Sequence, residues 1–121
     1  ALAERLVAYK HFRWMPGMHD CWGRCAVCDA AGGVRWGNPY NPADQHEPDH
    51  WPDLTDPGTL GCLLALVAVA YGVTVDDVHV VRTTGMVWSV WIFRFDGSSY
   101  RVATHEPSRA EALVVALEAA P

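Results

Sequence analysis

One segment of this chain combines continuous hydrophobicity with clear start and stop signals. No residue between Asp56 and Asp76 is charged. Asp56 suits a helix N-cap, Pro57 suits the first helical position, and Gly72 suits the position that closes a helix. The pattern predicts a helix over residues 57–71. Because this helix has no polar face, we expect it to be covered on every side by the fold or by a partner.

Glycine and proline residues interrupt the uncharged segment. It approaches the length of a membrane span, but Pro57, Gly58, Gly61 and Gly72 shorten its continuous apolar part to that of a buried helix. We therefore predict no membrane span. Gly61 should cost about 1 kcal/mol relative to alanine inside a helix. We expect that it allows another backbone to approach closely.

Segments with a period of two residues follow this helix. They predict strands over 78–83, 86–95 and 99–104, joined by turns at Thr84-Gly85 and Asp96-Gly97. Apolar residues occupy both faces of the middle strand. We therefore expect a central strand that is covered on both sides.

The ends of the chain predict helices, and a short hairpin lies between them. Residues 2–11 have helical spacing of apolar positions, and Ser108 with Glu111 forms a capping box that begins a final helix. Residues 24–28 and 34–36 read as two short strands joined by a glycine-containing loop. The apolar stripe of the final helix consists of Ala110, Leu113, Val114 and Leu117.

Residues 37–55 differ from the rest of the chain. They form a polar, acidic and proline-rich stretch without periodicity, which predicts a long surface loop. The order of elements predicts a single α+β domain over residues 1–121. Its antiparallel sheet would comprise the N-terminal hairpin and the three-stranded meander, packed by the central helix and the C-terminal helix. Half of the 121 residues are hydrophobic, which is enough for a core of its own.

The charge of the chain restricts the partners it could bind. The formal net charge is −5, with nine lysine and arginine residues, which argues against binding to nucleic acid. Residues 57–120 share the α-β-β-β-α order of double-stranded-RNA-binding domains. The final helix, however, opens without a lysine, and Lys10 is the only lysine in the chain. Residues 1–15 lack the pattern of a signal peptide, so we expect a cytoplasmic protein with reduced cysteines.

A cluster of thiols near the N-terminus is a candidate metal site. His19, Cys21, Cys25 and Cys28 include ligand types that bind zinc, although a second pair of closely spaced cysteines is missing. If residues 24–28 form a strand, Cys25 and Cys28 point to opposite faces. We favour structural cysteines and no cofactor. The alternative is a small zinc-stabilised binding module that uses these four residues.

No arrangement of residues supports catalysis. His46 and His50, with Glu47 between them, have the spacing of a metalloprotease motif, but Pro48 breaks the helix that this motif requires. The sequence contains no recognisable catalytic motif that pairs a nucleophile with a general base, and no phosphate-binding glycine loop. We therefore expect a protein that is not an enzyme.

Tryptophan is frequent in this chain, with six residues in a small domain. Trp51 lies in the proline-rich loop and is the best candidate for an exposed partner anchor. The alternative is that this ring covers the core beneath the loop. In the first interpretation Glu47, Asp49, Trp51 and Asp53 bind a partner protein with a basic surface.

Four segments of the chain resemble small uncharacterised proteins encoded by phages and prophages. These segments are residues 13–18, 52–57, 59–67 and 110–114. The resemblance implies a bacterial host cell and an accessory phage role, and it brings no catalytic residues. We hypothesise a binding protein that engages a host protein, such as an inhibitor of CRISPR interference. We also expect a homodimer, formed through the central helix or the sheet.

Overall fold

A computed structural model describes residues 2–20, 25–28, 34–36 and 51–121, with only the backbone described at 27–28 and 34–36. The elements in these residues confirm the predicted α+β class. They are α1 (Leu2–Val7), β1 (Ala26–Cys28), β2 (Val34–Trp36), α2 (Pro57–Tyr71), the 3₁₀ turn η2 (Val75–Asp77), β3 (Val78–Thr83), β4 (Val87–Phe93), β5 (Ser99–Glu106) and α3 (Arg109–Glu118).

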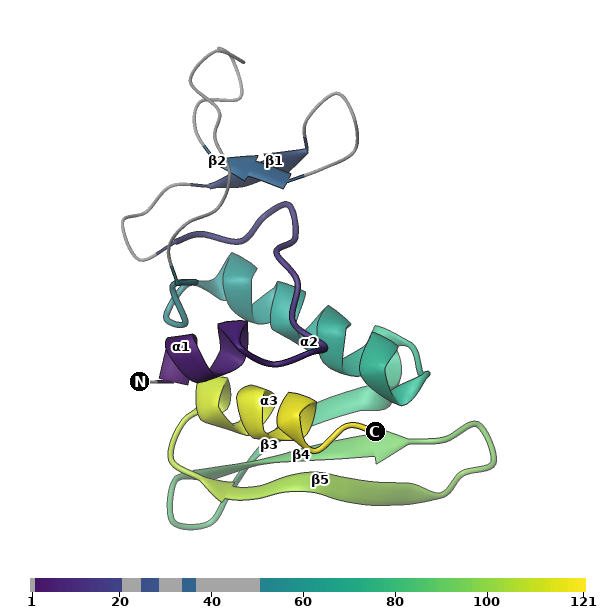
Figure 1. Cartoon of the computed structure of the whole chain (residues 1–121). Helices are drawn as coiled ribbons and strands as arrows, with labels where there is room; N and C mark the ends of the chain where they lie inside the picture. The colour runs from purple at the N-terminus through teal and green to yellow at the C-terminus, as the bar shows by residue number, and fades with distance from the viewer. Residues whose placement is uncertain (1, 21–24, 29–33, 37–50) are drawn as a thin grey trace.

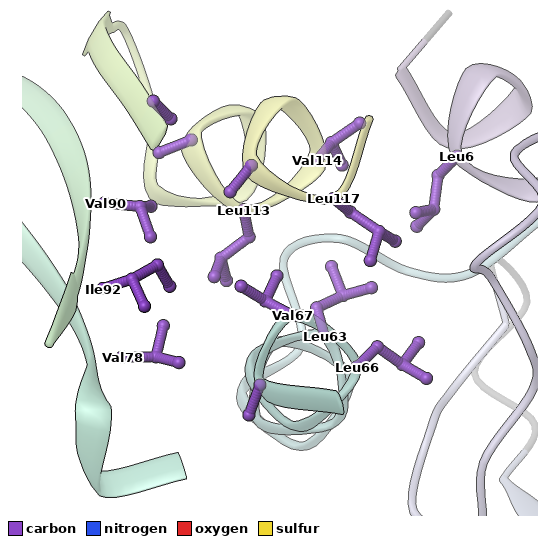
Figure 2. Close-up of a cluster of buried hydrophobic side chains, with 14 of the residues drawn as sticks. Leu6, Leu63, Leu66, Val67, Val78, Val90, Ile92, Leu113, Val114 and Leu117 are labelled. Atoms are coloured by element: carbon purple, nitrogen blue, oxygen red, sulfur yellow. The ribbon is translucent and has the colours of Figure 1, made fainter. Parts of the chain in front are cut away.

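The helices lie on one face of the three-stranded sheet (Figure 1). Helix α3 packs on β4 and β5, and α2 packs on α3 and also contacts β3. The side chains between these layers are fully or almost fully buried, because both helices direct apolar stripes at the inner face of the sheet (Figure 2). This core includes Leu63, Leu66, Val67, Val78, Val90, Ile92, Leu113, Val114 and Leu117.

Helix α2 begins and ends at the predicted residues. The Asp56 side chain accepts a hydrogen bond from the backbone N–H of Thr59 at 2.8 Å. At the other end Gly72 has a φ of 70°, and the N–H of Val73 reaches the carbonyl oxygen of Ala68 at 2.9 Å. The first contact is the N-cap predicted from Asp56, and the second is the helix ending predicted from Gly72.

The described part of the fold covers α2 only in part, so the expected cover on the remaining side stays a prediction about a partner. Val69 is 63% exposed, and Gly61 is also exposed. A Cβ atom at Gly61 would meet no atom within 4 Å, so this glycine does not admit another backbone. A Cβ atom at Gly58 would instead lie 2.9 Å from the carbonyl oxygen of Gly17. The outward side of α2 thus includes Gly61 and the exposed apolar side chain of Val69.

The sheet has the predicted meander order β3-β4-β5, with antiparallel pairs throughout. Strand β4 is shorter than predicted, because Met86 has a φ of 62° and the N–H of Arg94 closes a turn on the carbonyl oxygen of Ser98. Strand β5 continues two residues beyond the predicted end at 104. It does so with shifts of register against β4, which are typical of β-bulges.

The prediction that β4 is covered on both sides also needs correction. Val90 and Ile92 face the helices and are fully buried, but no helix of the described residues covers the opposite face (Figure 1). Side chains from the edge strands partly cover that face. The Arg101 guanidinium lies 5.5 Å from the centre of the Trp91 ring, and the ring centroids of His79 and Phe93 are 4.4 Å apart.

The N-terminal region differs from prediction at both its helix and its hairpin. Helix α1 ends at Val7 instead of continuing to residue 11, because the chain turns and Tyr9 donates a hydrogen bond to the carbonyl oxygen of Glu118 at 2.7 Å. Strand β1 begins at Ala26, and β1 with β2 forms a separate two-stranded sheet (Figure 1). Among the described residues, no helix combines the length and hydrophobicity that crossing a bilayer requires.

Candidate functional site

A groove of about 600 Å³ opens where four segments of the chain meet. The start of α1, the turn before α2, the first turns of α2 and the start of α3 form its walls. Most of its lining is apolar, and single charged side chains of both signs, Asp53 and Arg109, stand among them. The lining residues are Leu2, Ala3, Pro52, Asp53, Leu54, Thr55, Leu60, Ser108, Arg109 and Ala110.

Trp51 is exposed and comes directly before the lining of this groove. Its exposed fraction is 47%, whereas the next residue, Pro52, is buried and forms an isolated β-bridge with Asp20. The bridge ties this end of the proline-rich segment to the chain before β1. The structure therefore supports the interpretation of Trp51 as an exposed ring over its interpretation as a cover for the core.

Asp53 has a local structural role besides its charge. Its carboxylate accepts hydrogen bonds from the backbone N–H of Thr55 at 3.0 Å and from the hydroxyl of Thr55 at 2.6 Å. Its own N–H donates to the carbonyl oxygen of His19 at 2.8 Å. The other two predicted partner-binding residues, Glu47 and Asp49, lie outside the described residues. So do His46, Pro48 and His50.

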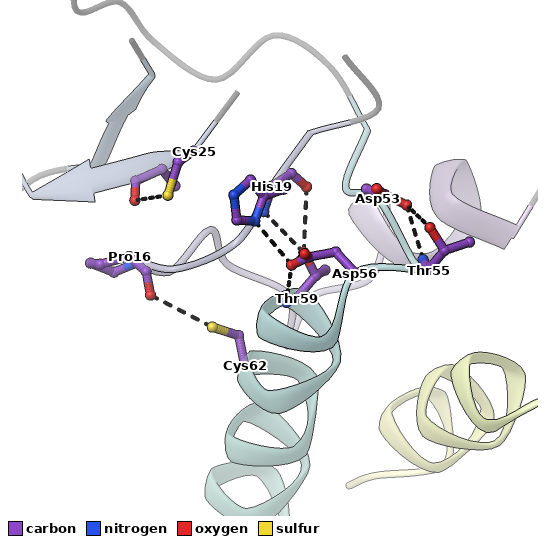
Figure 3. A network of polar contacts seen from close by, with 9 residues as sticks. Pro16, His19, Cys25, Asp53, Thr55, Asp56, Thr59 and Cys62 are labelled. Atoms are coloured by element: carbon purple, nitrogen blue, oxygen red, sulfur yellow. Dashed lines mark hydrogen bonds and ion pairs between the residues drawn. The ribbon is translucent and has the colours of Figure 1, made fainter. Parts of the chain in front are cut away.

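A polar network joins the chain before β1 to the first turn of α2 (Figure 3). The Asp56 carboxylate oxygen Oδ2 lies 3.0 Å from His19 Nδ1 and 3.1 Å from the Thr59 hydroxyl oxygen. The backbone N–H of His19 donates to the same hydroxyl at 2.9 Å. Thr59 is completely buried, so its polar atoms are satisfied by this network instead of by water.

The charge of Asp56 determines which nitrogen of His19 carries a proton. The hydrogen bond from the Thr59 backbone, with help from His19, holds the pKa of the Asp56 carboxyl below its ordinary value of 3.8. The carboxylate is therefore ionised at neutral pH and can only accept hydrogen bonds. His19 Nδ1 must be the donor in this contact, which leaves Nε2 with the lone pair in the neutral imidazole.

Two cysteine side chains are described near this network. Cys25 is paired with His19 in an isolated antiparallel bridge. The Cys62 thiol in α2 lies 3.6 Å from the carbonyl oxygen of Pro16, and partial burial raises its pKa. Cys21 lies outside the described residues, and only the backbone of Cys28 is described. Within the described part of the chain, no group of three or more potential ligands is arranged to hold a metal ion.

A second hollow of about 520 Å³ lies at the far end of α2. The hairpin between β4 and β5 forms one wall, where the Phe95 side chain is fully exposed. Arg94 covers the Tyr100 ring here, with its guanidinium carbon 4.6 Å from the ring centre. Arg94 therefore already has an aromatic partner within the protein.

Sequence reasoning found some of these residues and missed others. The N-cap signal identified Asp56, but its contact with His19 spans 37 residues of sequence and has no local signature. Thr59 gave no signal beyond its place in an apolar helix. The groove was missed because its walls come from segments at both ends of the chain. Comparisons with family models, with curated proteins and with solved structures found no match for this chain.

Proposed function

We propose that this chain is a non-enzymatic binding protein that engages another protein through Trp51 and the adjoining groove. The observation that carries this proposal is that Trp51 is exposed and directly precedes Pro52, which lines the mostly apolar groove. Tryptophan is enriched among residues that dominate the free energy of protein binding, particularly beside apolar pockets. A bulky apolar side chain of the partner would occupy the groove while Trp51 packs against the surface beside it.

The partner that we propose has a basic surface around an apolar anchor. The chain carries a net charge of −5, and Glu47 and Asp49 precede Trp51 in the sequence. Asp53 adds a carboxylate at the groove itself. Complementary charge of this kind accelerates association and excludes acidic partners. The phage resemblance leads us to propose a protein of the bacterial host cytoplasm, with a component of a defence system such as CRISPR interference as the first candidate.

Capture of a partner from a bacterial host lysate tests this proposal. Two variants are compared with the unmodified protein, one at Trp51 and one at Phe95. Trp51→Ala should lose the captured protein, whereas Phe95→Ala should retain it, because Phe95 is an even more exposed aromatic residue that is absent from the lining of the groove. With the purified partner, Trp51→Ala should weaken affinity at least tenfold, or by about 1.4 kcal/mol. Equal capture by both variants would contradict the proposal, as would a lower melting temperature for Trp51→Ala.

Asp53 needs a conservative variant because its side chain also holds a turn. Asp53→Asn keeps an oxygen that accepts the hydrogen bonds from Thr55 and removes only the charge. We expect Asp53→Asn to slow association with the partner and to reduce its dependence on salt. An unchanged salt dependence would show that this carboxylate does not face the partner.

We also propose a homodimer formed through the outer face of the three-stranded sheet. Half-buried Trp91 and Phe93 and the 40% exposed Val81 support this choice, because no helix of the described residues lies on them. A charged residue at the centre of such an interface should separate the subunits. Light scattering at micromolar concentration should give twice the mass of the chain, and Val81→Lys should give the mass of a single chain. A single-chain mass for the unmodified protein would contradict the dimer.

A further inference from the structure

A basic segment follows α1 and runs beside α2 (Figure 1). Residues 10–13 have the sequence Lys-His-Phe-Arg, so two cations, an imidazole and an aromatic ring occupy four consecutive positions. Together with Leu66, Val69 and Ala70 of α2, this segment lines a hollow of about 240 Å³. One wall of the hollow therefore carries the cations, and the other wall is apolar.

Hydrogen bonds fix the position of the basic segment. The N–H of Phe12 donates to the carbonyl oxygen of Tyr9 at 3.0 Å, and the Tyr9 hydroxyl donates to the carbonyl oxygen of Glu118 at 2.7 Å. His11 Nε2 lies 2.7 Å from the carbonyl oxygen of Pro121, which can only accept, so the imidazole donates there. The backbone of the segment is thus held in place, and its imidazole already has a partner.

Lys10 and Arg13 are the two cations of this hollow. Both residues are exposed, and neither forms an ion pair with another residue in the described part of the chain. Glu118, the last residue of α3, is paired with Arg5 at 2.8 Å and does not neutralise them. The hollow therefore presents positive charge to solvent, in a chain whose formal net charge is −5.

The apolar wall of the hollow is also open to solvent. Val69 is 63% exposed, and Ala70 is half-buried. Helix α2 contains no charged residue, so it offers neither cation a carboxylate. A partner that is complementary to both walls must combine carboxylates with an apolar side chain.

We infer that the hollow binds an acidic peptide segment of a partner protein. An apolar side chain of that segment would pack against Val69, and the carboxylates beside it would pair with Lys10 and Arg13. Exposed ion pairs contribute little free energy by themselves, so a free anion such as phosphate would bind weakly. Burial of the apolar side chain supplies the larger part of the free energy of binding. This inference does not depend on the proposed binding through Trp51.

Two other kinds of anionic partner fit this surface less well. Recognition of acidic lipids commonly uses clusters of about four to eight lysines and arginines, and nucleic-acid binding uses a basic patch or stripe. This hollow has two cations, and the net charge of −5 repels both kinds of surface. A small hollow also admits a single side chain more readily than the broad surface of a bilayer.

Fluorescence anisotropy of a labelled synthetic peptide, titrated with the full chain, tests the inference. The probe is an acidic peptide with a leucine between glutamates. Two comparison peptides replace the leucine with serine or the glutamates with lysines. We expect saturable binding of the probe with a Kd below about 1 mM, and at least about tenfold weaker binding of both comparison peptides. Added salt should also weaken binding of the probe.

Variants of the protein locate the site. Arg13→Glu and Val69→Gln should each weaken binding of the probe by about tenfold. Arg82→Glu is the matched control for charge, because Arg82 is exposed on β3 and is absent from the lining of the hollow. Trp51→Ala should also keep the affinity for the probe, which separates this site from the groove beside α1. Circular dichroism checks that each variant is folded.

Several results would overturn the inference. These are equal binding of all three peptides, no binding of the probe at about 1 mM, and an equal loss of affinity in Arg13→Glu and Arg82→Glu. Cosedimentation with vesicles of phosphatidylserine and phosphatidylcholine tests the lipid alternative, and vesicle binding that requires Arg13 would also contradict a peptide site. If Val69→Gln is not folded, the serine-containing peptide still decides whether an apolar side chain is needed, because it leaves the protein unchanged.

Discussion

Gly58, in the first turn of α2, lies directly against the carbonyl oxygen of Gly17. A Cβ atom at position 58 would be 2.9 Å from that oxygen and 3.1 Å from the carboxylate of Asp56. The chain before β1 can approach α2 this closely only because position 58 has no side chain. The same approach allows the backbone of His19 to reach Thr59. One glycine thus permits the whole polar network at this end of the helix.

Alanine at the two glycines of α2 should therefore have opposite effects. Gly58→Ala should lower the free energy of unfolding by about 1–3 kcal/mol, since backbone must move to relieve the overlap. Gly61→Ala should raise it by about 0.5–1 kcal/mol, because position 61 is open and alanine favours helix. Urea denaturation of both variants measures the difference. Equal destabilisation would show that Gly61 also has a close neighbour.

Asp56 should make the stability of the protein depend on pH in the acid range. Its folded pKa lies below the ordinary value of 3.8, so its contribution is complete above that value and is lost as pH falls through the folded pKa. Asp56→Ala should cost about 1 kcal/mol at neutral pH through loss of the cap. It should also make the acid decline in melting temperature shallower. A decline of unchanged slope in this variant would assign the acid sensitivity to other carboxylates.

Tyr71 should produce the corresponding effect in alkali. Burial, with smaller contributions from Tyr100 and Tyr9, raises its pKa from 10.0 to about 12. The contribution of Tyr71 is complete below pH 10 and is lost as pH rises toward 12, because the unfolded chain ionises first. Tyr71→Phe should remove this alkaline decline and cost about 1 kcal/mol at neutral pH, since the hydroxyl donates to the carbonyl oxygen of Ala116 at 2.7 Å. Thermal unfolding across this pH range is the measurement, with Tyr100→Phe as the control that keeps the decline.

Truncation of a buried side chain between α2 and the sheet should strongly lower the free energy of unfolding. Leu113 is 1% exposed and lies between α3, α2 and β4 (Figure 2). Leu113→Ala should cost about 2–5 kcal/mol, because it removes buried surface and leaves a cavity. Val69→Ala, on the outward side of α2, should change stability by less than about 0.5 kcal/mol. Similar losses for the two variants in urea denaturation would show that the outward side of α2 is also packed.

Predictions from local pattern were correct where the physical cause is local. The bounds of α2 follow from Asp56, Pro57 and Gly72, whose effects act within one helical turn. The capping box at Ser108 placed the start of α3 for the same reason, since the Ser108 side chain accepts from the N–H of Glu111 at 3.1 Å. The end of α1 was wrong because the contact of Tyr9 with Glu118 spans the whole chain.

The amino-acid sequence by itself determined the class of the fold, both ends of α2, the start of α3 and the order of the meander. Backbone capping, turn geometry and side-chain periodicity depend on residues a few positions apart, so they can be read along the chain. Only the tertiary structure decided that His19 meets Asp56, that Gly58 rather than Gly61 allows another backbone to approach, and that the described helices cover one face of β4 and not the other. Those contacts join segments distant in sequence, and they depend on which surfaces fit together once the core between α2, α3 and the sheet is packed.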